Sequence, residues 1–371
     1  MLKIVIATPF WRSPRGGGID AHVNGLVKTL KKNTKNIDLK IIFVDGTDSD
    51  NYQISGGRFF RVFNIFSTLR KIKPDIINVR QNWLLLFGSW IYCRFNRNVK
   101  LIYTFHTEPE FSVNRYLKFK NRVKKMIYQP ALNQCDYVTL ISKNLEKEYR
   151  ENWGLVIKTN KVIIHAGVTA RDASVQEKKD FLKKYKIKED SIILLAQSFT
   201  ASITKSEGAK ILLRALKKLT KKFPKIKLIL TREGAFSKAL KEYAKIQGVY
   251  ENTVFTGNLE NPFIPLELCD VFTWPFVGTM GMGMALLEAM SVGKPIIITS
   301  ATGLYEPITN GVDGMIVKPN EDDLYQGIVK LIEDKKFAGE LGKNAQKTVS
   351  ERFTWDISAK KYLEIYGIDH E

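Results

Sequence analysis

The stretch "DVFTWPFVGTMGMGMALLEAMSVGKPIIIT", residues 270–299, contains a complete strand, turn, helix and strand. Its two apolar runs, "DVFTWP" and "PIIIT", are short and rich in apolar residues, which is typical of strands buried on both faces. Between them, Gly281 and Gly283 precede a helix predicted to begin near Met284, and a helix start offers free backbone N–H groups to an anion. Glu288 lies about one turn further along, where its carboxylate is suited to accept hydrogen bonds from hydroxyl groups. The alternative interpretation of Glu288 is a solvated helix face.

The same alternation of strand-like and helix-like runs continues in both directions from this stretch. The first half has strand-like runs from "KIVIAT" to "KVIIHAG", and the second half has them from "SIILLAQ" to "GMIVKP". Helical patterns such as "HVNGLVKTLKK" and "AKILLRALKKLTKKF" separate the runs. Strands that alternate with helices favour a parallel, doubly wound sheet. The pattern occurs twice, so the sequence predicts an α/β protein of two Rossmann-like domains, residues 1–168 and 169–353.

Loops that follow strands are the candidate ligand sites, because doubly wound sheets bind ligands at the carboxyl ends of their strands. In the first half, Gly17 and Gly18 precede a helix, and His106 follows the strand "KLIYTF". In the second half, Lys205 lies in the hydroxyl-rich loop "AQSFTASITKSEGAK", and Arg232 follows the strand "IKLILT". For His106 the alternative is a core histidine, and for the glycines it is a simple glycine turn.

A third loop of the first half, "NVRQNWLLL", combines cationic, amide and aromatic side chains after a strand. Arg80, Gln81 and Trp83 are therefore candidate ligand contacts. Their pattern does not identify the ligand.

Composition limits the class of protein. The three cysteines are scattered singly, which fits a reducing compartment and predicts no disulfide framework or metal cluster. The longest apolar run, Trp83–Cys93, is shorter than the roughly 20 residues that span a bilayer. We therefore expect a cytoplasmic protein.

The formal net charge of +20 is unevenly distributed. Residues 1–170 contain 28 basic and 12 acidic residues, a balance of +16, and residues 171–371 contain 30 and 26, a balance of +4. A positive field attracts nucleic acid, anionic lipid or phosphorylated substrates. No basic stretch is interleaved with aromatics in a nucleic-acid-binding pattern, so we expect no nucleic acid partner. The alternative is a lysine-rich surface that only confers solubility.

Two stretches of the first half favour a membrane surface as a partner. "RFFRVFNIFSTLRKIK", Arg58 to Lys73, and "RYLKFKNRVKKMIY", Arg115 to Tyr128, mix aromatic and aliphatic residues with Arg and Lys, as interfacial helices do. We therefore expect peripheral attachment to the cytoplasmic face of an anionic membrane. The alternative is that both apolar faces simply pack on the first sheet.

Four segments together resemble a known family. "PRGGGIDAHVNGLVKTL" resembles the amino-terminal signature of retaining GT-B glycosyltransferases of family four, and "IIHAGV" is similar to the turn that ends their first domain. The segment from Gly281 to Leu324 resembles their donor region, and it is the most specific of the four. "RFTWDISAKKYLEIY" resembles their closing helix, so residues 354–368 are expected to pack back on the first domain.

The resemblance implies a nucleotide-sugar donor held mainly by the second domain and a glycan or lipid-linked acceptor held mainly by the first. It implies transfer of a hexose with retention of configuration, and it implies no metal or other cofactor. Glu288 matches a carboxylate that holds ribose, while Gly281 and Gly283 match the glycines of the donor turn. The residues assigned to donor binding are Gly17, Gly18, Gly281, Gly283, Met284 and Glu288. The residues assigned to catalysis are His106, Lys205 and Arg232. The residues assigned to the acceptor are Arg80, Gln81 and Trp83.

Three positions depart from the family pattern. Met280 replaces an acid that contacts the transferred sugar, Ser202 replaces an arginine, and Glu207 replaces a lysine. The two missing cations would stabilise the leaving diphosphate, and Lys205 and Arg232 are the residues predicted to replace them. The alternative is a catalytically degenerate GT-B protein that binds glycans or nucleotides as a partner subunit.

Overall fold

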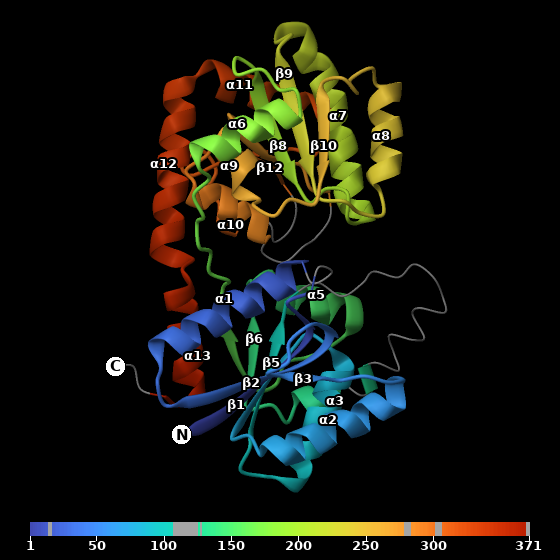
Figure 1. The fold of residues 1–371 in the computed structure, drawn as a ribbon, viewed down its shortest axis with the longest axis vertical. Coiled ribbons are helices and arrows are strands. Elements are labelled where there is room, and N and C mark those ends of the chain that lie inside the picture. Colours follow the sequence, from blue (N-terminus) through green and yellow to red (C-terminus); the bar gives the residue numbers. More distant parts are fainter. Residues whose placement is uncertain (14–16, 107–124, 127, 278–282, 301–305, 369–371) are drawn as a thin grey trace. The chain divides into compact units, whose positions relative to one another are not determined.

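The computed structural model describes residues 1–13, 17–106, 125–126, 128–277, 283–300 and 306–368, without the side chains of residues 58, 59 and 152. The chain forms two compact units. Unit 1 comprises Met1–Gly167 and Trp355–Glu371, and unit 2 comprises Val168–Thr354. Each unit is a parallel sheet with helices packed around it, which confirms the predicted α/β class (Figure 1).

Unit 1 is built on a seven-stranded sheet with the order β3-β2-β1-β4-β5-β6-β7. Its strands are β1 (Leu2–Trp11), β2 (Ile37–Gly46), β3 (Tyr52–Gln53), β4 (Ile76–Arg80), β5 (Lys100–Phe105), β6 (Tyr137–Leu140) and β7 (Asn160–Ile163). Its labelled helices are α1 (Gly17–Asn33), α2 (Arg58–Ile72), α3 (Trp83–Phe95), α5 (Asn144–Trp153) and α13 (Trp355–Tyr366). The strand order reverses between β1 and β4, which is where a doubly wound sheet opens a ligand crevice.

The two faces of the unit 1 sheet have different chemistry. On one face, apolar side chains such as Val79 and Tyr103 belong to the hydrophobic cluster that includes residues of α2 and α3. On the opposite face, Asn78 and Thr104 form part of a buried polar network with hydroxyl groups of α13. Because successive strand residues point to opposite faces, this alternation places polar groups beneath α13, which lies beside α1 (Figure 1).

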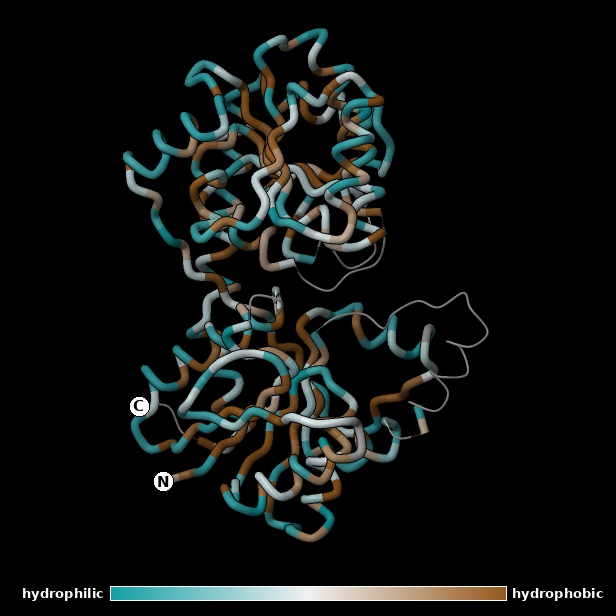
Figure 2. Tube along the Cα trace, turned by 45° about the vertical axis from the view of Figure 1, so that its right-hand side comes forward, coloured by the Kyte–Doolittle hydropathy of each residue, from teal (hydrophilic) through white to brown (hydrophobic). Residues whose placement is uncertain are grey.

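Unit 2 repeats the architecture with a six-stranded sheet of order β10-β9-β8-β11-β12-β13. Its strands are β8 (Ile192–Gln197), β9 (Ile226–Thr231), β10 (Thr253–Gly257), β11 (Val271–Trp274), β12 (Ile296–Thr299) and β13 (Met315–Val317). Its helices are α6 (Val175–Lys184), α7 (Ile203–Lys222), α8 (Ser237–Ile246), α9 (Phe263–Leu268), α10 (Met284–Ser291), α11 (Glu321–Glu333) and α12 (Lys335–Arg352). Figure 2 shows the hydrophobic strands inside each unit and the more hydrophilic helices around them.

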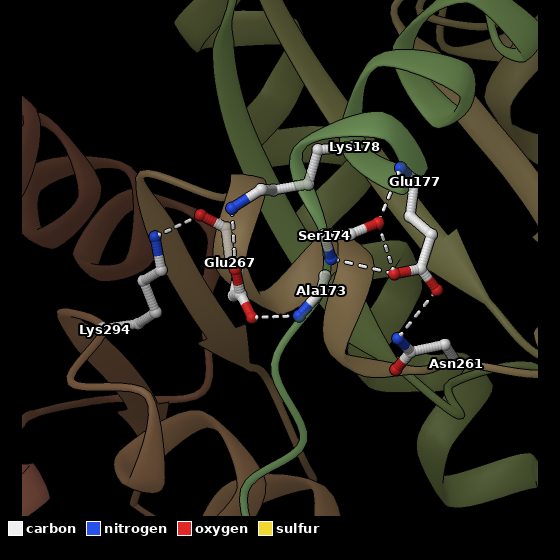
Figure 3. Close-up of polar contacts among 7 residues, drawn as sticks. All are labelled: Ala173, Ser174, Glu177, Lys178, Asn261, Glu267 and Lys294. Atoms are coloured by element: carbon white, nitrogen blue, oxygen red, sulfur yellow. Dashed lines mark hydrogen bonds and ion pairs between the residues drawn. The ribbon is translucent and has the colours of Figure 1, made fainter.

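Glu267 on α9 anchors the segment by which the chain enters unit 2 (Figure 3). Its carboxylate accepts hydrogen bonds from the Ala173 backbone N–H at 2.7 Å and from Lys178 Nζ at 2.9 Å. Its backbone carbonyl accepts a hydrogen bond from Lys294 at 2.7 Å. Ser174 then begins α6 with a capping box. These contacts fix the first helix of unit 2 against α9.

Candidate active site

Lys205 and Trp274 meet at the point where the strand order of unit 2 reverses, between β8 and β11. Trp274 ends β11 and is almost fully buried, and the ring of Phe199 packs edge-on against it at 5.2 Å between centroids. Lys205 lies in the first turn of α7, the helix that follows β8, with Nζ 5.9 Å from the centre of the Trp274 ring. This is the position at which doubly wound sheets bind ligands.

Gly208 allows α7 to approach the end of β11. A Cβ atom at this position would lie 1.6 Å from the carbonyl oxygen of Pro275, so no other residue fits without backbone movement. The helix and the strand are therefore in backbone contact. This contact places Lys205 over Trp274.

Arg232 brings a second cation to the carboxyl ends of the strands, directly after β9. Its backbone has φ of +73°, a left-handed conformation that costs free energy in a residue with a Cβ atom. The Thr200 hydroxyl donates a hydrogen bond of 2.7 Å to the Arg232 carbonyl. At Gly234 a Cβ atom would lie 2.4 Å from the Thr200 carbonyl oxygen. The loops after β8 and β9 are thus packed tightly together.

The electrostatics of Lys205 distinguish it from the surface lysines. Burial, together with repulsion from Arg232, lowers the pKa of Lys205 to about 8. Within the described part of the chain, neither Lys205 nor Arg232 has an acidic partner. Two adjacent cations without a counterion at the end of a parallel sheet form a candidate anion site.

Glu288 is the candidate acid of unit 2. It lies on α10, whose N-terminal residue Met284 follows Gly283 at the N-cap position. Among the described residues, no side chain caps this helix start, so its backbone N–H groups have no side-chain acceptor there. Burial raises the pKa of Glu288 to about 7. Gly281 and Met280 lie outside the described residues.

The two other departures from the family pattern lie on α7. Ser202 is the N-cap residue, and its hydroxyl is 3.4 Å from that of Thr204. Glu207 forms an ion pair with Lys210 at 2.7 Å, on the same helix. Neither position carries a cation. Lys205 is therefore the cationic side chain among the described residues of this loop and the first turn of α7.

His106 follows β5 in unit 1 and packs against a second histidine. Its ring centroid lies 4.6 Å from that of His22, which projects from α1. Burial and the positive charge of Arg80 lower the pKa of His22, and burial together with His22 and Arg80 lowers the pKa of His106. Both imidazoles are therefore neutral near pH 7. The Nε2 atom of His106 has no hydrogen-bond partner among the described residues.

Gly17 and Gly18 begin α1, the helix that carries His22. Gly17 has φ of +52°, a left-handed conformation that glycine adopts without strain. The three residues before Gly17 lie outside the described part of the chain.

The structure gives Arg80 a different role from the predicted acceptor contact. Its side chain is fully buried, it donates a hydrogen bond of 2.7 Å to the Tyr362 hydroxyl on α13, and its guanidinium lies over that ring at 4.6 Å. An acceptor cannot reach a side chain that is enclosed in this way. Arg80 therefore serves the packing of α13 on the sheet.

The other two residues of the predicted acceptor set also make internal contacts. Gln81 donates a hydrogen bond to the Tyr149 hydroxyl at 2.8 Å and accepts one from the His106 backbone N–H. Trp83 begins α3 and packs, half-buried, against the hydrophobic cluster. Gln81 thus couples the ends of β4 and β5, and it positions the backbone of His106.

Sequence reasoning missed His22, Trp274 and Tyr362 as members of these clusters. Trp274 had a usable signal, since it ends an apolar strand that is followed by a glycine turn. Tyr362 had none, because its contact with Arg80 spans 282 residues of sequence.

Among the described residues, no group of three or more His, Cys, Asp or Glu side chains is arranged to hold a metal ion. No helix within the described ranges is long and apolar enough to cross a membrane.

Comparisons with known proteins agree with this geometry. Residues 16–171 match the family model "Glycosyltransferase Family 4", and residues 177–348 match "Glycosyl transferases group 1". An uncharacterised glycosyltransferase of Methanocaldococcus jannaschii is 27% identical over 98% of both chains. The crystal structure of a glycosyltransferase from Rickettsia africae superposes with a TM-score of 0.79, at 20% identity and 98% coverage of both chains.

The protein belongs to these glycosyltransferases and has their GT-B fold. A further structure with that fold is Anabaena HepE, solved with UDP and with UDP-glucose. It covers 99% of this chain and all of its own, with 17% identity and a TM-score of 0.78. Both family models and the curated relative above are glycosyltransferases, and they do not favour the catalytically inactive alternative.

Proposed function

We propose that the protein transfers a hexose from a nucleotide-sugar to a glycan or lipid-linked acceptor with retention of configuration. The observation that carries the proposal is the pair of cations, Lys205 and Arg232, at the strand ends of unit 2, for which the described residues supply no acidic partner. A diphosphate placed there would supply the missing negative charge. The solved structure of Anabaena HepE with UDP-glucose supports a donor of this chemical class.

The reaction breaks the bond between the anomeric carbon of the hexose and the diphosphate, and the acceptor oxygen forms the new bond. The acceptor hydroxyl releases its proton, and the nucleoside diphosphate leaves with an additional negative charge. Lys205 and Arg232 are positioned to stabilise that charge as it develops. The role needs no metal ion in the proposal, because the two side chains supply the positive charge.

Glu288 and His106 are assigned to binding hydroxyl groups. The Glu288 carboxylate would accept hydrogen bonds from the ribose, and the N–H groups at Gly283 and Met284 would face the phosphates. His106 is neutral, so it can donate or accept one hydrogen bond to a sugar hydroxyl without adding charge. Arg80 is left out of the acceptor site, and Gln81 is assigned to positioning His106.

The test is a Lys205→Met substitution, assayed with a panel of nucleotide-sugars and with lipid-linked and glycan acceptors. We expect kcat to fall about 100-fold or more, because a charge-stabilising group at the leaving group acts mainly in the transition state. Lys217→Met is the matched control, since Lys217 is an exposed lysine on the same helix. The control should retain wild-type activity.

Two results would contradict the proposal. One is full activity of the Lys205→Met protein. The other is the absence of both transfer and donor hydrolysis in the wild-type protein with every donor of the panel.

A further inference from the structure

Helix α2 has two apolar sides, and only one of them packs on the sheet. Ile65, Leu69 and Ile72 are buried in the hydrophobic cluster of unit 1. Phe60 and Phe63 point away from that cluster and are 71% and 69% exposed. The predicted alternative, that the apolar face of this helix simply packs on the sheet, therefore accounts for the inner side of α2. It leaves the outer side without a partner in the part of the chain that the structure describes.

The exposed aromatic surface continues from α2 onto α3. The two helices pack side by side (Figure 1), with the Gly88 backbone of α3 against Ile65 of α2. Phe66 is half-buried in this contact, and its ring meets that of Phe95 edge-on at 6.1 Å. Phe95 ends α3 and is 76% exposed. Single exposed apolar residues are common, whereas three exposed phenylalanines on one adjoining helix pair are not.

Basic side chains accompany the aromatic rings. Arg70 lies on the same side of α2 as Phe60 and Phe63, because residues three and seven apart share a helix face. Lys71 is exposed beside it. At the end of α3, exposed Arg94 and Arg97 flank Phe95 and, with Trp90 and Gln134, line a surface pocket.

The charge of this region is mainly positive. Residues 51–99 contain eight basic residues and a single acidic one, Asp75. None of the four exposed basic side chains near the phenylalanines forms an ion pair within the described residues. We call this surface the aromatic–basic face, and it consists of Phe60, Phe63, Arg70, Lys71, Arg94, Phe95 and Arg97.

We propose that the aromatic–basic face binds an anionic lipid bilayer. Aromatic rings enter the boundary between headgroups and acyl chains, and Arg and Lys attract the anionic headgroups. The seven residues of the face include both kinds of group and no acidic residue. Asp136, which lines the same surface pocket as Arg94 and Arg97, is an acidic neighbour of the face. The interaction does not depend on the enzyme's activity, and it would hold the protein at a surface where lipid-linked acceptors reside.

The experiment is cosedimentation of the full chain with vesicles, without any substrate. One set of vesicles contains phosphatidylglycerol and phosphatidylcholine, and the other contains phosphatidylcholine alone. We expect binding to the anionic vesicles at low salt and release at high salt, because exposed charges are screened. Phe60→Ser with Phe63→Ser should weaken partitioning about tenfold or more, and Arg70→Gln with Lys71→Gln about thirtyfold at low salt.

Matched controls come from unit 2. Ile246→Ser removes an apolar side chain that is 76% exposed on α8, and Lys179→Gln with Lys183→Gln removes two exposed lysines from α6. Both control proteins should bind vesicles as the wild type does. Circular dichroism and the urea midpoint of each variant report whether it is folded.

Three outcomes would overturn the proposal. The first is equal binding of the wild type to neutral and anionic vesicles. The second is an effect of the control variants as large as that of the face variants. The third is a dimer in sedimentation equilibrium that becomes a monomer in the Phe60→Ser, Phe63→Ser double variant, while vesicle binding stays unchanged. That result would make the face a contact between two copies of the chain.

Discussion

Both sheets carry basic side chains at the carboxyl ends of their strands, but the two units use them differently. In unit 1, Arg80 is enclosed beneath α13 and hydrogen-bonded to Tyr362. In unit 2, Lys205 and Arg232 keep part of their surface exposed and have no acidic partner among the described residues. The residue type and its place in the sheet are therefore not enough to identify a ligand group. The basic side chains of the two units differ in whether another residue of the protein is their partner.

The largest expected effect tests the acid of unit 2. Burial raises the pKa of Glu288 from its usual 4.5 to about 7, which means that the charged form is unfavourable in the folded protein. Stability from this group is fully present below the unfolded pKa and is lost as the pH rises through about 7. Glu288→Gln should therefore raise the free energy of unfolding by about 3 kcal/mol at pH 8, at roughly 1.36 kcal/mol per pKa unit.

The measurement is urea denaturation of both proteins at pH 8 and pH 5, with calorimetric titration of UDP alongside. At pH 5 we expect the gain to fall below about 1 kcal/mol, because Glu288 is then protonated in the folded protein and only partly protonated in the unfolded chain. UDP should bind the Glu288→Gln protein more weakly, since an amide oxygen is a weaker acceptor for ribose hydroxyls than a carboxylate. An equally large stability gain at both pH values would exclude burial of the charge as the cause.

The second effect tests the buried cation of unit 1. Tyr362→Phe removes the hydroxyl that accepts the Arg80 hydrogen bond and leaves a buried charged donor without this partner. We expect a loss of about 2 kcal/mol in the free energy of unfolding. UDP binding should be unchanged, because the substitution lies in unit 1.

The control for Tyr362→Phe is Tyr325→Phe on α11, whose hydroxyl makes no hydrogen bond within the described residues. It should change stability by less than about 0.5 kcal/mol, as surface substitutions do. If Tyr362→Phe changed the free energy of unfolding as little as the control does, the Tyr362 hydroxyl would not be an important partner of Arg80. The contrast between the two units would then fail.

The smallest effect tests the cation of unit 2 through pH. The pKa of Lys205 is lowered to about 8, so the free protein loses this charge as the pH rises through 8. A bound diphosphate would raise the pKa again, and binding would then take up a proton. UDP affinity should fall about tenfold between pH 7 and pH 9, or about 1.4 kcal/mol.

The Lys205→Met protein is the reference for this titration. UDP ionises in the same way in both experiments, and the variant lacks the ionisation of the lysine. Its UDP affinity should show only the nucleotide's own pH dependence. Identical pH profiles for both proteins would remove Lys205 from the diphosphate site. The lowered pKa of Lys205 also affects folding. The free energy of unfolding decreases as the pH falls through 8, because the folded protein disfavours the charged form of the lysine.

The fold class was readable from sequence because buried parallel strands have a short, β-branched pattern that does not depend on distant residues. The edge strand β3, Tyr52–Gln53, was missed because two residues have no periodicity. The role of Arg80 could not be predicted either. Its burial depends on Tyr362, and nothing near Arg80 in the sequence indicates that a helix 282 residues away will cover it.

The candidate site of unit 2 was only partly readable. Lys205 and Arg232 follow strands, which made them candidates, but their electrostatic interaction depends on two close backbone approaches. These approaches occur at Gly208 and Gly234, where glycine is required by Pro275 and Thr200 respectively. The sequence shows the glycines, and the structure shows what each one makes room for.

The place of α13 in unit 1 has a consequence for the order of synthesis. The ribosome delivers all of unit 2 before Trp355 and Tyr362 emerge, so the sheet of unit 1 must wait for its last helix. Until then Arg80 lacks its hydroxyl partner, and the space that Gly25 leaves for the Trp355 ring is unfilled. Unit 2, which is continuous in sequence, can therefore complete its folding first, although it is translated second.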